Sequence, residues 1–304
     1  MIGKASGGPG RSNPAGASAV LGRVKERAVA LETTLLLHGV PRASAAGLAR
    51  DLCAIVRAAG AVPATIGILS GQPIAGLSDA ELGELLGADV PKVNLANLGL
   101  AIHRKTHGAT TVSSTMAIAA AAGIRVFATG GIGGVHPGFG QHLDISADLM
   151  ALSRFPVAVV TSGCKAVLEV ESTREALETL GVPVVGFGTQ TFPAFYMRHS
   201  GASVDARFDD VADLAGFCTQ ELERTGRGIV IAHPIPQADE VAQDDWERWY
   251  TQAQSETAHL TGRDRTPALL AALHQCSEGA TLEANLALVR ANARLAGELA
   301  AAMG

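Results

Sequence analysis

The stretch that decides the fold runs from residue 126 to residue 165 and reads VFATGGIGGVHPGFGQHLDISADLMALSRFPVAVVTSGCK. Two short apolar runs, Val126–Ala128 and Val157–Val160, read as buried strands. Four glycines at positions 130 to 134 follow the first run, and glycine lets backbone N–H groups approach a ligand closely because it has no Cβ. The stretch ends at Lys165, after the polar residues His136, Asp144, Ser146 and Asp148. We therefore expect a site for an anionic, hydroxyl-rich small molecule.

Outward from this stretch, strand-like runs alternate with helical patterns about six times. Val24–His38 and residues 63–71 are apolar runs that read as strands, whereas Ser44–Ala59 and Ser114–Ala122 have the composition of helices. This alternation predicts an α/β fold, a three-layer α/β/α sandwich around a mostly parallel central sheet. In such sheets the ligand site lies beyond the carboxyl ends of the strands.

Length and composition restrict the class of protein. The 304 residues carry a net charge of −5 and are 47% hydrophobic, with no basic stripe that would bind nucleic acid. No apolar run approaches the ~20 residues that cross a membrane, and the four scattered cysteines fit a reduced, cytoplasmic setting. Residues 1–22 are rich in Gly, Ser and Pro and are expected to be a disordered tail, which leaves residues 23–304 as a single domain.

Two ionisable residues lie in apolar runs. Glu32 interrupts the apolar run Val24–His38, and an acid inside a buried strand needs a partner or a function. The alternative is an edge strand with Glu32 in solvent or paired with Arg42. Lys165 follows an apolar strand and precedes a predicted helix, where the helix dipole disfavours a cation. A lysine that is neutral in such a place can attack a carbonyl and form a Schiff base, although an ordinary lysine at a helix start is the simpler interpretation.

The remaining polar motifs are individually ambiguous. Thr110 and Thr111 precede an alanine-rich helix, where they would form an anion site or serve only as helix caps. Asp144 and Asp148 suit Mg²⁺ or Mn²⁺, but they also suit the start of a helix. The glycine loop matches neither a dinucleotide fingerprint nor a Walker A loop. The residues alone indicate a small-molecule enzyme, with lysine-dependent and metal-assisted mechanisms both open.

A set of motifs then occurs in a family's order: ALETTLLLHGVP, AVPATIGIL, GATTVSSTM, VFATGGIGGVH, DISADL, SGCKAVLEV, FPAFY and TLEANLALVRAN. The chain resembles the pseudouridine-5′-phosphate glycosidases, also called the indigoidine synthase A-like family, over nearly all of residues 24–300. The resemblance implies a cytoplasmic homotrimeric enzyme, a lyase or glycosidase acting on the C–C bond between C1′ of ribose 5-phosphate and a base. It also implies that the ribose ring opens and forms a lysine imine.

The resemblance assigns roles to residues. It makes Lys165 the nucleophile, Glu32 the general acid/base and Asp144 a ligand of Mn²⁺ or another divalent cation. Contacts to the sugar, phosphate or base are implied for Lys92, Thr110, Thr111, Val112, His136, Ser146, Ala147, Asp148 and Asn285. For Lys92, the simpler alternative is a surface lysine.

The chain departs from the family pattern in four places. Pro137 stands where the family usually has arginine, residues 95–97 replace an Arg-Arg-Asp segment, residues 38–43 replace HGMPYP, and His233 replaces asparagine. Lost arginines should weaken phosphate contacts unless Arg42 or another arginine, Arg198, compensates. We expect that the chain keeps the family's reaction but acts on a different base or aglycone. The partners would be ribose 5-phosphate and a base, or another carbon nucleophile in C-nucleoside antibiotic formation. A non-catalytic sugar-phosphate-binding protein is the remote alternative.

Overall fold

The computed structural model describes residues 20–24, 26–259 and 265–304. Its strands are β1 (Leu21–Gly22), β2 (Ala28–Glu32), β3 (Val62–Leu69), β4 (Gln72–Ala75), β5 (Lys92–Val93), β6 (Ala109–Thr110), β7 (Val126–Ala128), β8 (Ala158–Thr161), β9 (Val184–Phe187), β10 (Ala206–Phe208) and β11 (Ile229–Ala232). In the described part of the chain, nine of them form one sheet in the order β1-β4-β3-β2-β7-β8-β11-β9-β10, while β5 pairs with β6. Every neighbouring pair of the large sheet is parallel except β3 and β4.

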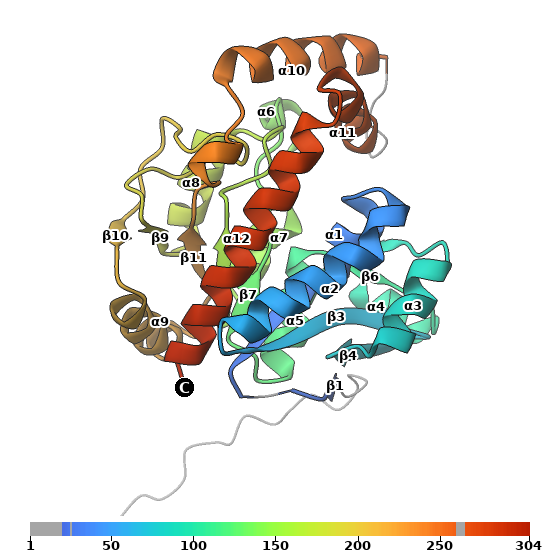
Figure 1. The fold of residues 1–304 in the computed structure, drawn as a ribbon, viewed down its shortest axis with the longest axis vertical. Coiled ribbons are helices and arrows are strands. Elements are labelled where there is room, and N and C mark those ends of the chain that lie inside the picture. Colours follow the sequence, from blue (N-terminus) through green and yellow to red (C-terminus); the bar gives the residue numbers. More distant parts are fainter. Residues whose placement is uncertain (1–19, 25, 260–264) are drawn as a thin grey trace, which may run out of the picture.

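Helices cover both faces of the sheet, so the predicted three-layer α/β/α sandwich with a mostly parallel sheet is confirmed (Figure 1). The helices are α1 (Thr33–His38), α2 (Arg42–Ala58), α3 (Asp79–Gly87), α4 (Leu98–His103), α5 (Val112–Ala121), α6 (Phe139–His142), α7 (Ala147–Leu152), α8 (Val170–Thr179), α9 (Val211–Thr225), the 3₁₀ turn η1 (Gln237–Asp239), α10 (Gln243–Thr257), α11 (Arg265–Cys276) and α12 (Ala280–Ala302). In Figure 1, α2 and α12 cross in front of the sheet and α5 and α7 lie behind it. No helix in the described residues is both long and apolar enough to cross a membrane.

The central strands β2, β7 and β8 are buried along their whole length, because helices cover both of their faces. Parallel strands bring their carboxyl ends to one edge of the sheet. At that edge, Glu32 closes β2, Thr129 follows β7 and Ser162 follows β8. The fold therefore places the end of β2 next to the two loops that follow β7 and β8 within residues 126–165.

One expectation about element boundaries is wrong. The run Val24–His38 is not one strand, because β2 ends at Glu32 and Thr33–His38 forms α1. A short apolar run fits either structure, and here the tertiary fold decides. Leu36 is buried on α1, and the Thr33 hydroxyl donates to the Ile66 carbonyl at 3.0 Å. The helix expected after Lys165, over about Thr173–Leu180, is present as α8, which begins at Val170.

The predicted tail and domain boundary fall largely outside the described residues, which begin at Val20. At the end of the predicted tail, Leu21 and Gly22 form β1 and pair in parallel with Ile74 and Ala75 of β4. The folded part therefore begins no later than Leu21, two residues before the expected boundary.

Candidate active site

Glu32 lies at the centre of the candidate site. Its strand runs between β3 and β7, so the edge-strand alternative is wrong, and the residue is 8% exposed. The Thr129 hydroxyl donates to Glu32 Oε1 at 2.6 Å. Burial raises the pKa of Glu32 to about 7, even though the Lys165 charge and the Thr129 hydrogen bond both act to lower it. Near neutral pH the carboxyl group can therefore both give and take a proton.

Lys165 lies beside Glu32, on the loop that leaves β8. Its backbone N–H donates to the Ile132 carbonyl at 3.0 Å, and the Ile132 N–H donates to the Gly163 carbonyl at the same distance. The lysine loop is thus tied to the glycine loop. Gly163 has a φ of +86°, and a Cβ there would lie 1.8 Å from the Pro193 carbonyl oxygen, so this turn needs glycine. The Lys165 side chain is half-buried, and its charge acts on Glu32.

Lys92 approaches the same pair from the small sheet. It begins β5, which pairs with β6, and it is an exposed residue. Desolvation of its ammonium group and the neighbouring Lys165 charge lower the pKa of Lys92, while Glu32 acts in the opposite direction. The charges of two lysines therefore act on one buried acid, while Lys92 is itself exposed and its predicted substrate contact stays a prediction.

Asp148 ties the glycine loop to α5. It is 4% exposed, its Oδ1 accepts the Ser113 N–H at 2.9 Å and its Oδ2 accepts the Gly133 N–H at 2.8 Å. A Cβ at Gly133 would lie 2.2 Å from Ser146 Oγ and 2.7 Å from Asp148 Oδ2, so the loop can approach this closely only as glycine. Asp148 therefore holds the loop in shape, and a substrate contact would be an additional role.

Ser146, rather than either aspartate, is the helix cap at α7. Its side chain accepts the Asp148 N–H at 3.2 Å, and Ala147 is the first residue of the helix. Both Ser146 and Ala147 are half-buried beside the glycine loop, since the Ser146 N–H donates to the Gly134 carbonyl at 2.9 Å. Their predicted substrate contacts remain a prediction.

The start of α5 is only partly available to an anion. Thr110 is fully buried, its hydroxyl donates to the Ile66 carbonyl at 2.7 Å and accepts from Thr115 at 2.9 Å. Val112 is also buried. Thr111 is half-buried, with its hydroxyl 3.1 Å from Ser113 Oγ. A phosphate at this helix end would therefore reach the Thr111 hydroxyl, whereas the Thr110 hydroxyl belongs to the core.

His136 and Asp144 lie on the outer side of the glycine loop. His136 Nδ1 is 3.8 Å from Asp144 Oδ2, and the Asp144 side chain is 67% exposed. Among the described residues, no three His, Cys, Asp or Glu side chains gather into a metal-binding group. A single exposed carboxylate fits a divalent cation that keeps most of its waters, as Mg²⁺ commonly does. Asp144 can therefore serve as one oxygen ligand.

Asn285 faces the glycine loop from α12. It is 7% exposed, and its Oδ1 has no hydrogen-bond partner among the described residues. A Cβ at Gly130 would lie 3.3 Å from this oxygen. Because buried acceptors are normally satisfied, Asn285 is suited to accept a hydrogen bond from a ligand N–H.

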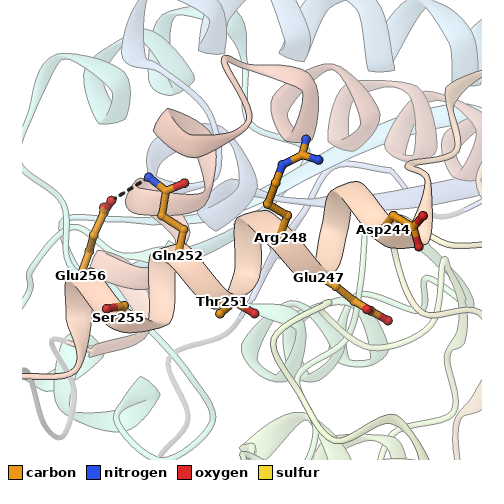
Figure 2. A pocket seen from close by; sticks show the side chains of 7 residues that line it. All are labelled: Asp244, Glu247, Arg248, Thr251, Gln252, Ser255 and Glu256. Carbon is orange, nitrogen blue, oxygen red and sulfur yellow. Dashed lines mark hydrogen bonds between the residues drawn. The ribbon is translucent and has the colours of Figure 1, made fainter.

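A separate hollow of about 770 Å³ lies along α10 (Figure 2). All its lining side chains come from that one helix: Asp244, Glu247, Arg248, Thr251, Gln252, Ser255 and Glu256. They project from the helix surface, and Gln252 donates to Glu256 at 3.0 Å (Figure 2). This hollow contains none of the predicted site residues, so the group around Glu32 is the better candidate.

The sequence pattern of the family described as "Indigoidine synthase A like protein" matches residues 21–302. The chain belongs to the indigoidine synthase A-like family. A pseudouridine-5′-phosphate glycosidase of Nocardioides sp. is 46% identical over 277 residues, which cover 90% of each chain. The enzyme of that name from Geobacillus kaustophilus is 45% identical over 280 residues, covering 91% of this chain and 93% of the relative.

Two solved structures share the fold of this family member. The prealnumycin C-glycosynthase AlnA, in complex with ribulose 5-phosphate, is 36% identical, with a TM-score of 0.84 over 91% of each chain. An indigoidine synthase A-like protein of Thermotoga maritima is also 36% identical, with a TM-score of 0.86 over 95% of this chain and 98% of the other. These matches confirm the family and the fold that the motifs predicted.

The two arginines that could compensate for the family's lost ones already hold backbone carbonyls. Arg42 Nε donates to the Leu86 carbonyl at 2.9 Å, so Arg42 is not the partner of Glu32. Arg198 donates to the Ile235 carbonyl at 2.5 Å. A phosphate contact from either would have to use its remaining N–H groups. Pro137, where the family usually has arginine, is exposed.

Sequence reasoning missed three residues that support the site. Asn292 is fully buried, and its Nδ2 donates to the Thr129 carbonyl at 2.8 Å and to Ser162 Oγ at 3.1 Å. The signal was a second asparagine seven residues after Asn285, which places both on one face of α12. Thr129 itself follows β7 directly. Phe195 packs so closely on the glycine loop that a Cβ at Gly131 would lie 2.6 Å from its ring.

Proposed function

We propose that this chain is an enzyme that makes or breaks the C–C bond between C1′ of ribose 5-phosphate and a base. The observation that carries the proposal is the convergence of Glu32, Lys165 and Lys92 at the carboxyl edge of the sheet, with the pKa of Glu32 raised to about 7 by burial. The pseudouridine-5′-phosphate glycosidases that resemble the chain over nine-tenths of its length support it.

Lys165 and Glu32 can together carry out the cleavage of the C–C bond. Glu32 first takes a proton from the Lys165 ammonium group. The neutral Nζ then bonds to C1′ while the C1′–O4′ bond breaks, and O4′ takes that proton from Glu32. The new ammonium group returns a proton to Glu32. The nitrogen lone pair then forms a C=N bond as the bond between C1′ and the base breaks, and Glu32 gives its proton to the base carbon. Water releases ribose 5-phosphate from Lys165, and the same steps reversed form the C–C bond.

Other groups would hold the substrate. Lys92 and the Thr111 hydroxyl at the start of α5 suit the phosphate, since a cation and a hydroxyl donor both bind anions. Asn285 suits an N–H of the base because its buried oxygen lacks a partner among the described residues. A divalent cation such as Mn²⁺, held through Asp144, would neutralise part of the phosphate charge. Assembly as a homotrimer and a cytoplasmic location come from the family resemblance and stay predictions.

Synthesis is the second candidate direction. The solved relative AlnA is named a C-glycosynthase and carries ribulose 5-phosphate in its structure. The chain also lacks arginine at Pro137 and in residues 95–97, which suggests a different aglycone from that of the glycosidases.

Borohydride trapping tests the lysine chemistry. Ribose 5-phosphate and uracil are added to the protein, borohydride reduces any imine, and peptide mass spectrometry locates the adduct. We expect the label on Lys165, its loss in Lys165→Ala, and its retention in the exposed-lysine control Lys105→Ala. Glu32→Ala should still trap the imine but stall release of the product.

An unlabelled Lys165 in the wild-type protein would contradict the mechanism. A thermal shift with ribose 5-phosphate in the absence of labelling would favour the non-catalytic sugar-phosphate-binding protein. Where labelling succeeds, uracil release from pseudouridine 5′-phosphate and C-ribosylation of added carbon nucleophiles separate the two directions.

A further inference from the structure

His233 is a half-buried side chain that the proposed steps do not use. It directly follows β11, and its backbone N–H donates to the Thr161 carbonyl at 2.9 Å. Its Nδ1 lies 3.0 Å from Asn292 Oδ1, and its ring meets Phe187 edge-on at 6.1 Å between centroids. The imidazole is therefore held on two sides at the same sheet edge as the candidate site.

The neighbouring bonds fix which atom donates. Asn292 Nδ2 faces the Thr129 carbonyl at 2.8 Å, and a carbonyl can only accept. The Asn292 oxygen is therefore the atom that faces His233, so the imidazole must donate from Nδ1. This assigns His233 the tautomer with its proton on Nδ1.

The chain of hydrogen bonds continues to the acid. Asn292 holds the Thr129 carbonyl, and the Thr129 hydroxyl donates to Glu32 Oε1 at 2.6 Å. Asn292 is fully buried and Thr129 is 1% exposed, so water cannot readily replace either bond. His233, Thr129 and Glu32 follow or close β11, β7 and β2, and Asn292 of α12 joins the first two.

We propose that His233 is a positioning residue for Glu32: by donating Nδ1–H to Asn292 it holds Thr129 where its hydroxyl donates to the carboxyl group. The acid/base role of Glu32 belongs to the proposed function, but the positioning itself does not depend on it. Asparagine at position 233 also carries an N–H donor, so an amide should replace the imidazole in this role.

The charged groups around Glu32 and around His233 leave this positioning role intact across neutral pH. Glu32 faces Lys165, Lys92 and Asp148, and none of these changes when His233 is replaced. Burial lowers the pKa of His233, against the effect of Asn292, and the Arg198 charge lowers it further. The imidazole therefore stays neutral near pH 7, and its Nδ1 proton remains available to Asn292.

The test measures Glu32 without needing turnover. In protein labelled with ¹³C-glutamate, the Glu32 carboxyl signal is assigned by its absence in Glu32→Gln and titrated by NMR. Since the Thr129 bond favours the ionised carboxylate, His233→Ala should move the Glu32 midpoint to higher pH, by at most about one pH unit. His233→Asn should keep the wild-type midpoint. His274→Ala is the matched control, because it removes a half-buried histidine bonded to Thr281 at 2.8 Å, outside this chain of bonds.

Kinetics with pseudouridine 5′-phosphate add a second readout. For His233→Ala we expect kcat to fall about tenfold, the size of one lost hydrogen bond, with KM within twofold. A cavity of about 510 Å³ lined by His233, Phe187 and Pro236 gives added imidazole a route to the vacated position, so imidazole should restore part of kcat.

An unchanged Glu32 midpoint in His233→Ala, with only a lower melting temperature, would overturn the positioning role. A shift of the Glu32 midpoint and a loss of kcat in His233→Asn equal to those in His233→Ala would overturn it as well. If His233→Ala does not fold, nitrogen–proton NMR correlations of the wild-type histidines decide, since a proton on Nε2 alone refutes the assignment. A moved midpoint without turnover in any variant would refute the proposed function and leave the positioning role standing.

Discussion

Replacing Glu32 with glutamine should stabilise the protein above pH 7 and change its stability little near pH 4.5. In the unfolded chain Glu32 ionises with its ordinary pKa of 4.5, whereas burial raises its pKa to about 7 in the folded protein. Between these values the folded state holds the proton more tightly, so wild-type stability is lost as pH rises through 7. The shift corresponds to roughly 3.5 kcal/mol, at about 1.4 kcal/mol for each pKa unit.

Urea unfolding at pH 5 and pH 8, followed by tryptophan fluorescence, measures the effect. About 2.5 kcal/mol of the difference between wild type and Glu32→Gln should appear between these two pH values. Glutamine keeps a carbonyl oxygen for the Thr129 hydroxyl, so the substitution removes the charge and little else. The matched control is Glu298→Gln, which changes an exposed glutamate of α12 and should give the same difference at both pH values.

A gap between wild type and Glu32→Gln that does not change with pH would refute the reasoning. It would mean that the two lysines offset the cost of burying the carboxylate completely. A gap that grows as described would show that the acid is kept at the expense of stability, the usual relation between a functional group and its fold.

Two further predictions concern the glycine loop and the metal. Gly133→Ala places a Cβ 2.2 and 2.7 Å from side-chain oxygens and should lower the free energy of unfolding by about 1–3 kcal/mol, whereas Gly140→Ala, with open space around it, should not; equal urea midpoints would contradict this. Asp144→Ala should abolish Mn²⁺ binding by titration calorimetry without changing the melting temperature, because its side chain is 67% exposed. The exposed control Asp239→Ala should bind as wild type, and Mn²⁺ binding that survives in Asp144→Ala would refute the assignment.

Glu32 and Lys165 could be identified as candidate site residues from their positions in the predicted strands. Glu32 and Lys165 were marked because each interrupts or ends an apolar run, and parallel strands bring such ends to one edge. Their convergence could therefore be expected before the structure. The same reasoning failed at Thr33–His38, where a short apolar run gives no periodicity to separate a strand from a helix.

The supporting residues could not be predicted in the same way, because their partners are far away in the chain. Thr110 and Asp148 were marked as ligand-binding groups from local sequence. In the structure Thr110 bonds to Ile66, and Asp148 bonds to the backbone at Ser113 and Gly133, which gives both a structural role beside the predicted one. Short polar side chains beside glycines serve either purpose, and only the packing of α5 against α7 decides which.

The protonation behaviour of Glu32 is the clearest property that depends on the whole fold. The residue type and its place in an apolar run were visible in the sequence, but the sign of its pKa shift was not. Two lysines and a hydroxyl favour the charged carboxylate, and an exposed acid among them would be a stronger acid than usual. Burial outweighs all three because β2 lies inside a nine-stranded sheet with helices on both faces, so the depth of one strand sets the pKa of the acid that the proposed chemistry needs near neutrality.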